Sequence, residues 1–286
     1  MRINTNVASL NAQESATKTN VNLSSSLEKL SSGLRINKAS DDASGLSIAD
    51  KLRTQASSIG QGISNANSAV SLTQIADKAM AEESNILDIV KTKLLQAATA
   101  TTSSAGREAI SKDVDKLLAQ VNNIAAQTNY NGISLLQTSA GGTAATDAGG
   151  LTFQVGETSA DTITSSGAVQ ANVTGLSLGS LKSAVAATSA MTGSLAQALL
   201  TKVDGAIDTL NGWRSDFGST QNQLESATRN MMTQQTNIKA AESVIRDVDY
   251  ASESANFNKQ NIISQAGTYA MSQANSVQQN VLRLLQ

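Results

Sequence analysis

The sequence predicts a mainly α-helical fold: a long antiparallel coiled-coil rod with a small β-hairpin region, its N- and C-terminal helices paired in an inner coiled-coil domain. Three observations predict it. Apolar residues recur every seven positions along two long stretches. Aromatic residues make up only 2% of the 286 residues, which favours slim, closely packed helices over a core built on rings. No proline is present to interrupt a helix.

Composition excludes several functional classes. Lys and Arg number 21 against 23 Asp and Glu, and no basic patch stands out, so we expect no nucleic-acid partner. Without His or Cys, thiolate metal sites, disulfides, the HExxH zinc motif and His-dependent triads cannot form. No other catalytic or cofactor motif was identified, and we expect neither an enzyme nor a cofactor. No apolar run has the length of a membrane span or a signal peptide, which by general rules predicts a cytoplasmic protein without a membrane partner.

The first predicted helix runs from about Ile3 to Leu34, with a thin apolar stripe whose heptad register slips once near the middle. An amphipathic helix in a globular core is the alternative, but so long a helix with so thin a stripe is more typical of a coiled coil. Gly33 can end this helix, and Ser40 or Asp41 can cap the next. The Asp41-Asp42 pair lacks the spacing of a calcium-binding loop, so capping explains it better.

A second helix is predicted from about residue 46 to residue 100. Its heptad positions are Leu52, Ile59, Ala66, Thr73, Met80, Leu87 and Leu94, and a companion set lies four residues later at Ala56, Ile63 and Val70. A third helix follows with one apolar face formed by Ile110, Val114, Leu117, Leu118, Val121 and Ile124. It ends near Asn131-Gly132, a dipeptide typical of a tight turn.

Residues 133–193 change to Gly, Ser, Thr and Ala, with β-like runs at 151–155 and 173–178, so we expect one or two hairpins in an exposed insert. The next helix carries the strongest periodicity, at Val203, Leu210, Phe217, Leu224, Met231, Ile238 and Ile245. The last helix, to about Leu285, has a stripe of mostly Ala that buries too little area to stand alone. Its unfinished apolar seam suggests self-assembly.

Seven stretches near the two ends carry a resemblance: residues 3–6 (INTN), 27–37 (LEKLSSGLRIN), 41–46 (DDASGL), 241–250 (AESVIRDVDY), 256–257 (NF), 265–267 (QAG) and 280–285 (NVLRLL). These stretches resemble bacterial flagellins. The resemblance covers roughly residues 1–140 and 195–286. It implies a structural subunit of the flagellar filament, the helical propeller of swimming, in a minimal form with a short variable region. The alternatives are a hook-filament junction protein of the same flagellum and a minor flagellin.

The resemblance also implies the domain plan. Residues 1–44 and 247–286 would form the two halves of an inner helical domain. Residues 45–132 and 194–246 would supply the helices of a rod, and 133–193 its β- and loop-rich insert. Flagellins leave the cell unfolded through the flagellum's own type III export channel, so the expected location becomes the extracellular filament. The implied partners are further copies of the same chain, an export chaperone and the filament cap protein.

We expect the self-assembly interface to use the seam positions of the two terminal helices: Ile3, Val7, Leu10, Leu27, Leu30, Leu34, Ile262, Val277, Val281, Leu284 and Leu285. The hydroxyl-rich insert is the expected place of O-linked sugars, as in glycosylated flagellins. Its candidate acceptors are Ser139, Thr143, Ser159, Thr164 and Ser165, with Thr146, Thr162 and Ser166 in the same stretch.

Resemblance to flagellins finally implies a segment read by the mammalian Toll-like receptor for flagellin, with the pattern Leu-Gln-Arg-x-Arg-Glu-Leu. The matching stretch keeps Leu87 and a positive charge at Lys91, but has Ile89 for the first Arg. Thr92 and Lys93 replace the Glu and the final Leu. Ile cannot replace a bidentate Arg, so we expect weak or no activation of this receptor.

Overall fold

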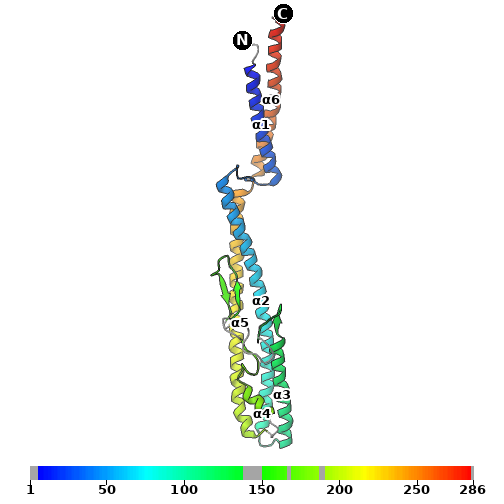
Figure 1. The fold of residues 1–286 in the computed structure, drawn as a ribbon, viewed down its shortest axis with the longest axis vertical. Coiled ribbons are helices and arrows are strands. Elements are labelled where there is room, and N and C mark those ends of the chain that lie inside the picture. Colours follow the sequence, from blue (N-terminus) through cyan, green and yellow to red (C-terminus); the bar gives the residue numbers. More distant parts are fainter. Residues whose placement is uncertain (1–5, 138–149, 166–168, 187–190, 285–286) are drawn as a thin grey trace. The chain divides into compact units, whose positions relative to one another are not determined.

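A computed structural model describes residues 6–137, 150–165, 169–186 and 191–284 (Figure 1). These residues form six helices and two small antiparallel sheets. The helices are α1 (Val7–Ser32), α2 (Ala43–Ala98), α3 (Ser104–Gln127), α4 (Gly179–Ala186), α5 (Gly193–Arg246) and α6 (Tyr250–Leu284). One sheet pairs β1 (Asn129–Tyr130) with β2 (Ile133–Ser134), and the other pairs β3 (Thr152–Gln154) with β4 (Thr162–Thr164). The predicted mainly α fold with a small hairpin region is confirmed.

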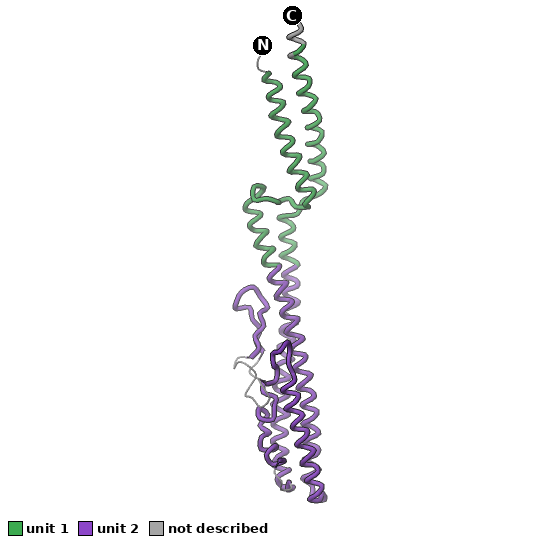
Figure 2. Tube along the Cα trace, turned by 45° about the vertical axis from the view of Figure 1, so that its right-hand side comes forward, with its two compact units in different colours: residues 1–56, 236–286 green, residues 57–235 purple. Residues whose placement is uncertain are grey.

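The chain divides into two compact units (Figure 2). Unit 1 contains residues 1–56 and 236–286, and unit 2 contains residues 57–235. Helices α2 and α5 contribute to both, because each boundary falls inside a helix. Each unit is therefore made from segments that are distant in the sequence.

Unit 2 is built on the parts of α2 and α5 that it contains, with α3 beside them (Figure 1). Ion pairs fix how the helices run. Arg214 lies 3.0 Å from Asp77, and Lys91 lies 2.6 Å from Asp204, so α5 is antiparallel to α2. The Lys93–Asp113 pair, at 2.8 Å, joins α2 to α3. These exposed pairs set the register more than they stabilise it.

The heptad predicted for α2 forms the core of unit 2, with a correction to its companion set. From Ile59 to Leu94 the predicted positions are all buried. Ala56, a predicted companion position, is buried, but further along the companion positions come three residues later, not four: Gly62, Ala69, Ala76, Glu83, Val90 and Ala97 are buried, whereas Ile63 and Val70 are half-buried. At Gly62 the lack of a side chain lets the Val155 carbonyl approach α2.

The predicted seam of α5 is buried from Val203 to Met231 and half-buried at Ile238 and Ile245. Its residues join those of α2 and α3 in one cluster that also receives the insert, through Leu136, Leu178 and Leu181. Leu, Val, Ala and Met fill most of this cluster, as the low aromatic content predicts.

Two hairpins lie in the predicted insert region. Asn131 and Gly132 have φ of 51° and 82°, the left-handed pair that a two-residue hairpin turn needs, so the Asn-Gly turn is confirmed. In the second hairpin Phe153 pairs with Ile163. This hairpin lies directly on α2, where a Cβ on Gly62 would be 2.1 Å from the Val155 carbonyl oxygen.

The second β-like run, residues 173–178, was predicted wrongly. It forms turns that lead into α4. The Asn172 carboxamide accepts a hydrogen bond from the Gly175 amide at 2.8 Å, and Leu178 N–H donates to the Val173 carbonyl at 2.9 Å. A local side-chain acceptor thus competes successfully with strand pairing. Helix α4 was not predicted, because eight residues are too few for a periodic pattern.

None of the helices in the described part of the chain combines the length and the hydropathy that crossing a bilayer requires.

Candidate functional site

The terminal helices α1 and α6 pack along a seam of small and polar residues. On α1 the residues that face the pair are half-buried or buried at heptad spacing: Ser9, Ala12, Ala16, Thr19, Leu23, Ser26 and Leu30. On α6 they are Glu253, Phe257, Gln260, Ser264, Gly267, Met271 and Ala274. The alternation of three and four residues is that of a coiled coil. Its core here is mostly hydroxyl, amide and methyl groups.

Hydrogen bonds across the seam replace part of the missing apolar contact. The Ser264 hydroxyl donates to Asn20 at 3.1 Å, and the Asn6 amide donates to the Ala274 carbonyl at 3.2 Å. Ser26 donates to the Glu253 carboxylate. Because such bonds exchange with water, each adds only about 1 kcal/mol. The pair therefore holds its two helices in register without burying much apolar surface.

Leu23, Leu30, Phe257 and Met271 face the seam, but six other bulky apolar side chains of the two helices point away from it into solvent. On α1, Val7 is 59% exposed, Leu10 54% and Val21 64%; on α6, Ile262 is 67% exposed, Tyr269 74% and Val277 50%. Their spacings are close to whole helical turns, which puts each set on one side of its helix. We call these six residues the outer stripes. An exposed apolar stripe of this kind marks an interaction surface.

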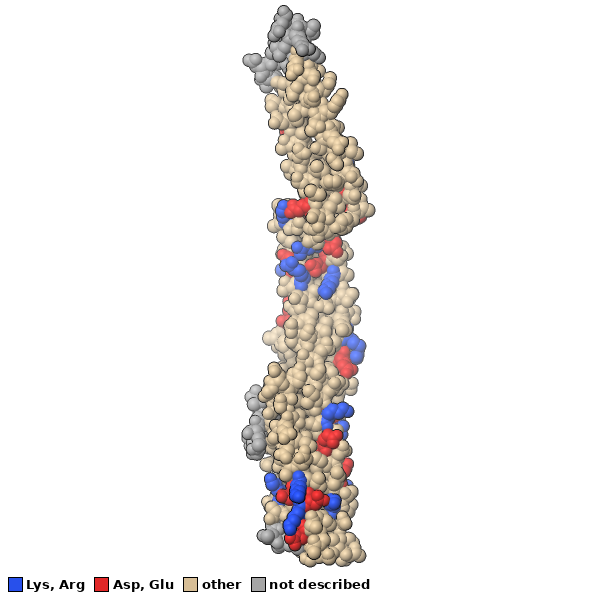
Figure 3. Space-filling model, turned by 90° about the vertical axis from the view of Figure 1, so that its right-hand side faces the viewer, with Lys and Arg blue, Asp and Glu red and all other residues tan. Residues whose placement is uncertain are grey.

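Charge is sparse beside the outer stripe of α6, where only Glu253 and Lys259 are charged between Tyr250 and Val277. On α1 the exposed residues Glu14 and Lys18 pair with each other at 2.6 Å between Leu10 and Val21. On the face shown in Figure 3 the terminal helix pair is almost free of blue and red side chains, while acidic and basic groups gather on the rest of the surface. Along α6, little charge has to be desolvated when this surface is covered.

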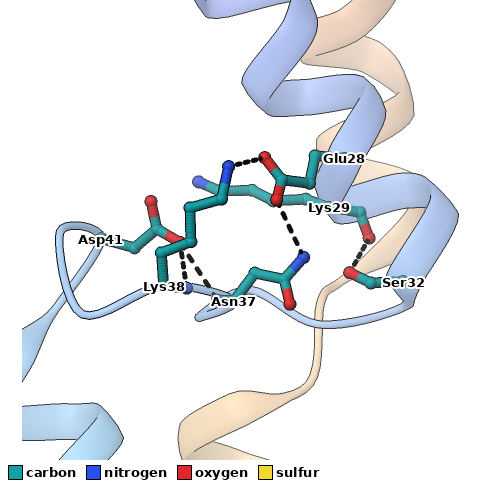
Figure 4. Close-up of polar contacts among 6 residues, drawn as sticks. All are labelled: Glu28, Lys29, Ser32, Asn37, Lys38 and Asp41. Atoms are coloured by element: carbon teal, nitrogen blue, oxygen red, sulfur yellow. Dashed lines mark hydrogen bonds and ion pairs between the residues drawn. The ribbon is translucent and has the colours of Figure 1, made fainter.

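The connector between α1 and α2 is held by local polar contacts (Figure 4). Gly33, with φ of 73°, ends α1 as predicted. The Lys38 ammonium lies 2.6 Å from Glu28, which raises the pKa of Lys38. The Asp41 carboxylate accepts hydrogen bonds from the backbone N–H groups of Lys38 and Asn37, at 2.9 and 3.1 Å, and these lower the pKa of Asp41.

The predicted cap of the next helix needs a correction. Asp42, and not Ser40 or Asp41, accepts the hydrogen bond from Gly45 N–H at 2.8 Å at the start of α2. Asp41 is already used by the connector. The two adjacent carboxylates thus have separate structural roles, which supports capping over a calcium or catalytic site.

The two connectors of unit 1 are tied to each other. The Arg35 guanidinium donates to the Ile245 carbonyl, at 2.6 Å from Nη2, and Val248 N–H donates to the Gly33 carbonyl at 3.0 Å. The Tyr250 hydroxyl donates to the Leu30 carbonyl at 2.9 Å. These main-chain acceptors fix where α6 begins relative to the end of α1.

With this geometry established, comparison with known proteins identifies the family. The model of the bacterial flagellin N-terminal helical region matches residues 3–140, and that of the bacterial flagellin C-terminal helical region matches residues 200–285. The chain belongs to the bacterial flagellin family. The two matched regions contain every residue of the outer stripes.

Individual flagellins are similar in sequence to the whole of this chain or to a part of it. Flagellin of Bacillus subtilis is 35% identical over 303 residues, covering 100% of both chains. Flagellin B of Helicobacter pylori is 52% identical over 135 residues, which cover 47% of this chain and 26% of that protein. The chain thus matches only about a quarter of the length of that relative.

A solved structure of a putative flagellar hook-associated protein from Vibrio parahaemolyticus has a TM-score of 0.60 and 14% sequence identity. It covers 72% of this chain and 99% of that one. At this identity the likeness shows a shared fold and nothing about function.

The structure places the sequence-predicted interface residues of this flagellin in three groups. Val7, Leu10, Leu27, Ile262 and Val277 are exposed, and Leu30 and Leu34 are half-buried. Ile3 and Leu285 lie outside the described residues, and Val281 and Leu284 belong to α6 without a described side chain. The sequence reading missed Val21, Ile263 and Tyr269. The predicted set took only some of the apolar positions along each helix, and these three exposed residues fall outside it.

The insert of this flagellin exposes only some of the predicted sugar acceptors. Ser159 and Thr164 are exposed, as is Thr162, whereas Ser165 is 4% exposed. A buried hydroxyl is a poor acceptor in a folded chain, so Ser165 is corrected as a candidate. Ser139, Thr143, Thr146 and Ser166 lie outside the described residues.

The segment that corresponds to the flagellin receptor motif is largely engaged within unit 2. Leu87 is fully buried, while Ile89 is 46% exposed. Lys91 pairs with Asp204, which raises the pKa of Lys91, and Lys93 pairs with Asp113. The Thr92 hydroxyl donates to the Ile89 carbonyl at 2.8 Å. The two lysines therefore face carboxylates of their own chain.

Proposed function

We propose that this flagellin is a structural subunit that self-assembles into the bacterial flagellar filament. The observation that carries the proposal is the arrangement of the terminal helices. They join through small and polar residues and leave the outer stripes exposed. Fully burying one such side chain contributes about 1.5–3 kcal/mol, so covering several of them is enough to drive association. The natural occupant is the same surface of neighbouring copies, since one subunit cannot cover its own outer stripes.

Electron microscopy of purified protein tests this function. Monomer concentrated from low salt, with short filament fragments as seeds, should grow into uniform helical filaments. A monomer that stays dispersed, or forms only closed small oligomers, would contradict the proposal. A hook-filament junction protein would also stay dispersed under these conditions, and no structural feature favours that alternative.

The C-terminal apolar group belongs to the same proposal. Val281, Leu284 and Leu285 form the densest apolar cluster of the tail. Removing residues 277–286 should leave a soluble subunit with intact unit 2 that does not polymerise. Polymerisation of the truncated chain at an unchanged critical concentration would show that the remaining residues of the outer stripes are sufficient for assembly.

Its location and partners follow from the family. We infer that the chain is exported unfolded through the flagellar type III channel, with an export chaperone before passage and the cap protein at the filament tip. Lack of Cys and Pro supports this route, since no disulfide or slow prolyl isomerisation delays unfolding. Its role is structural and not enzymatic. Cell fractionation should find the chain in filaments sheared from the cell surface and not in the cytoplasmic fraction.

We further propose that this flagellin activates the mammalian Toll-like receptor for flagellin weakly or not at all. The support is that Ile89 stands where an Arg fork would be needed, and that Lys91 and Lys93 are paired within the chain. An Arg at an interface hot spot contributes roughly 2 kcal/mol or more. Reporter cells given Ile89→Arg with Thr92→Glu and Lys93→Leu should respond more strongly than to the wild-type monomer. An equal response would refute the proposal.

We also propose O-linked glycosylation of the insert, with Ser159 as the foremost described acceptor. Its supporting feature is position: Ser159 lies in the exposed loop between β3 and β4. Neighbouring Thr158 donates to Asp161 at 2.7 Å, which leaves Ser159 as the freer hydroxyl of the loop. Intact-mass measurement on native filaments should exceed 29.5 kDa, and Ser159→Ala should remove part of the excess. A mass matching the bare chain would end the proposal.

A further inference from the structure

One carboxyl group lies in the core of unit 2. Glu83 is 0% exposed on α2. It comes three residues after Met80 and four before Leu87, both fully buried, so it occupies a core position of the heptad. Its neighbour Glu82 is exposed. The phase of the helix therefore turns one of two adjacent glutamates inward.

Glu83 has no polar partner among the residues that the structure describes. Neither of its carboxyl oxygens has a hydrogen bond there. An ionised carboxylate in this position would be strongly unfavourable, because burial without a counter-charge costs several kcal/mol. Burial accordingly raises the pKa of Glu83 to about 9.

No charge on the helices packed here offsets that burial. On α2 the basic side chains are not available to pair with Glu83: Lys78 is exposed, and Lys91 pairs with Asp204. On α5, Arg214 pairs with Asp77, and Asp208 is exposed. Helix α3 has no charged residue after Lys116, and in the described insert between Asp161 and α5 the sole charged residue is the exposed Lys182. Desolvation is the single cause of the shift.

We propose that Glu83 is a proton-binding site in the core of unit 2, so that folding of this unit takes up one proton. The unfolded carboxyl has the ordinary pKa of 4.5, whereas the folded one stays protonated up to about pH 9. Between these values the folded state holds one more proton than the unfolded state. Stability therefore falls as pH rises through this window, is unaffected by Glu83 below it, and levels off above it. Unit 2 is stabilised by acid and weakened by alkali.

Denaturant unfolding of the full-length monomer at several pH values between 5.5 and 8.5 tests this inference. The variants are Glu83→Gln, which is neutral at every pH, and the matched control Glu82→Gln on the exposed side. The unfolding constant of the wild type, relative to that of Glu83→Gln, should rise up to about tenfold per pH unit. Glu82→Gln should follow the wild type. Parallel curves for wild type and Glu83→Gln would overturn the proposal.

A second measurement does not depend on a variant that folds. The infrared spectrum of the wild-type monomer at pH 7 should contain the carbonyl stretch of one protonated carboxylic acid, which should disappear on unfolding. A folded wild-type protein with only carboxylate bands would equally overturn the proposal. Since this site lies in unit 2 and not on the outer stripes, loss of the pH effect and loss of polymerisation are separate outcomes.

Discussion

At the scale of single residues, two glycines inside helices have opposite structural meaning. A Cβ on Gly62 of α2 would be 2.1 Å from the Val155 carbonyl oxygen, a backbone atom that cannot rotate away. A Cβ on Gly205 of α5 would meet nothing within 4 Å. Gly62 therefore permits the β3–β4 hairpin to dock, whereas Gly205 only weakens its helix.

We predict that Gly62→Ala lowers the thermal stability of the monomer by about 1–3 kcal/mol, because the hairpin must move. Gly205→Ala, the matched control, should raise it by about 0.5–1 kcal/mol, since Ala is the better helix former. Calorimetry of the two variants gives both signs in one experiment. Stabilisation of similar size in both would show that the hairpin is not in close contact with α2.

A second residue-scale prediction concerns Asp41 in the connector. The backbone N–H groups of Lys38 and Asn37 lower the pKa of its carboxyl below the ordinary 3.8. A lowered pKa means that the stabilisation is present above pH 3.8 and is lost as pH falls through the lower, folded value. Amide hydrogen exchange of Asn37 and Lys38, corrected for intrinsic rates, should therefore accelerate only in that acid range.

The Gly33 amide, which donates to the Lys29 carbonyl, is the internal control and should keep its protection. In Asp41→Asn the two connector amides should exchange faster than in the wild type wherever Asp41 is ionised, since a carboxamide oxygen is the weaker acceptor. Unchanged protection in that variant would assign the connector's order to its main-chain contacts instead.

At the scale of elements, the seven-residue periodicity predicted the long helices correctly. It did not predict which face of α1 and α6 is buried. The heptad from Val203 to Met231 predicted α5 and its buried side because packing against α2 and α3 repeats regularly. The same rule misjudged α1 and α6, since it assumes that bulky residues face the partner helix. There the seam is largely small and polar residues with Leu23 and Leu30 among them, while Val7, Leu10 and Val21 face outward.

Other misses have local causes. The sequence did not predict Glu83 as a core residue, because the companion positions of α2 were expected four residues after the first heptad positions. That spacing places residue 84, and not residue 83, in the core. The run at 173–178 has β propensity, but Asn172 closes a turn over it. The hydropathy pattern alone reveals neither a side-chain hydrogen bond to the backbone nor the spacing of the second row of core positions on a helix.

The polar seam also predicts that α1 and α6 are labile in the monomer. Backbone ordering costs about 1–2 kcal/mol per residue, and a seam of small residues offsets little of it. Limited proteolysis of monomer should trim the chain to a core near residues 45–245. The polymerised form should resist at the same sites. Equal resistance of the first and last forty residues in monomer would show that the pair is stable alone.

At the scale of the whole molecule, the two units divide the work of a flagellin. Unit 2 buries a continuous cluster made mostly of Leu, Val, Ala and Met. Unit 1 leaves the bulky residues of the outer stripes in solvent. The central claim is that these outer stripes, and not the seam between α1 and α6, supply the apolar surface for assembly.

The most direct test is the critical concentration for polymerisation of Tyr269→Asp. Tyr269 is 74% exposed, so a charge there leaves the isolated subunit intact but would be buried between subunits. The control, Thr268→Asp, adds the same charge to an adjacent exposed position that is about 100° around α6 from Tyr269. We predict that Tyr269→Asp raises the critical concentration at least about tenfold, or abolishes filaments, while Thr268→Asp has a much smaller effect. Equal critical concentrations for Tyr269→Asp and the wild type would contradict the account.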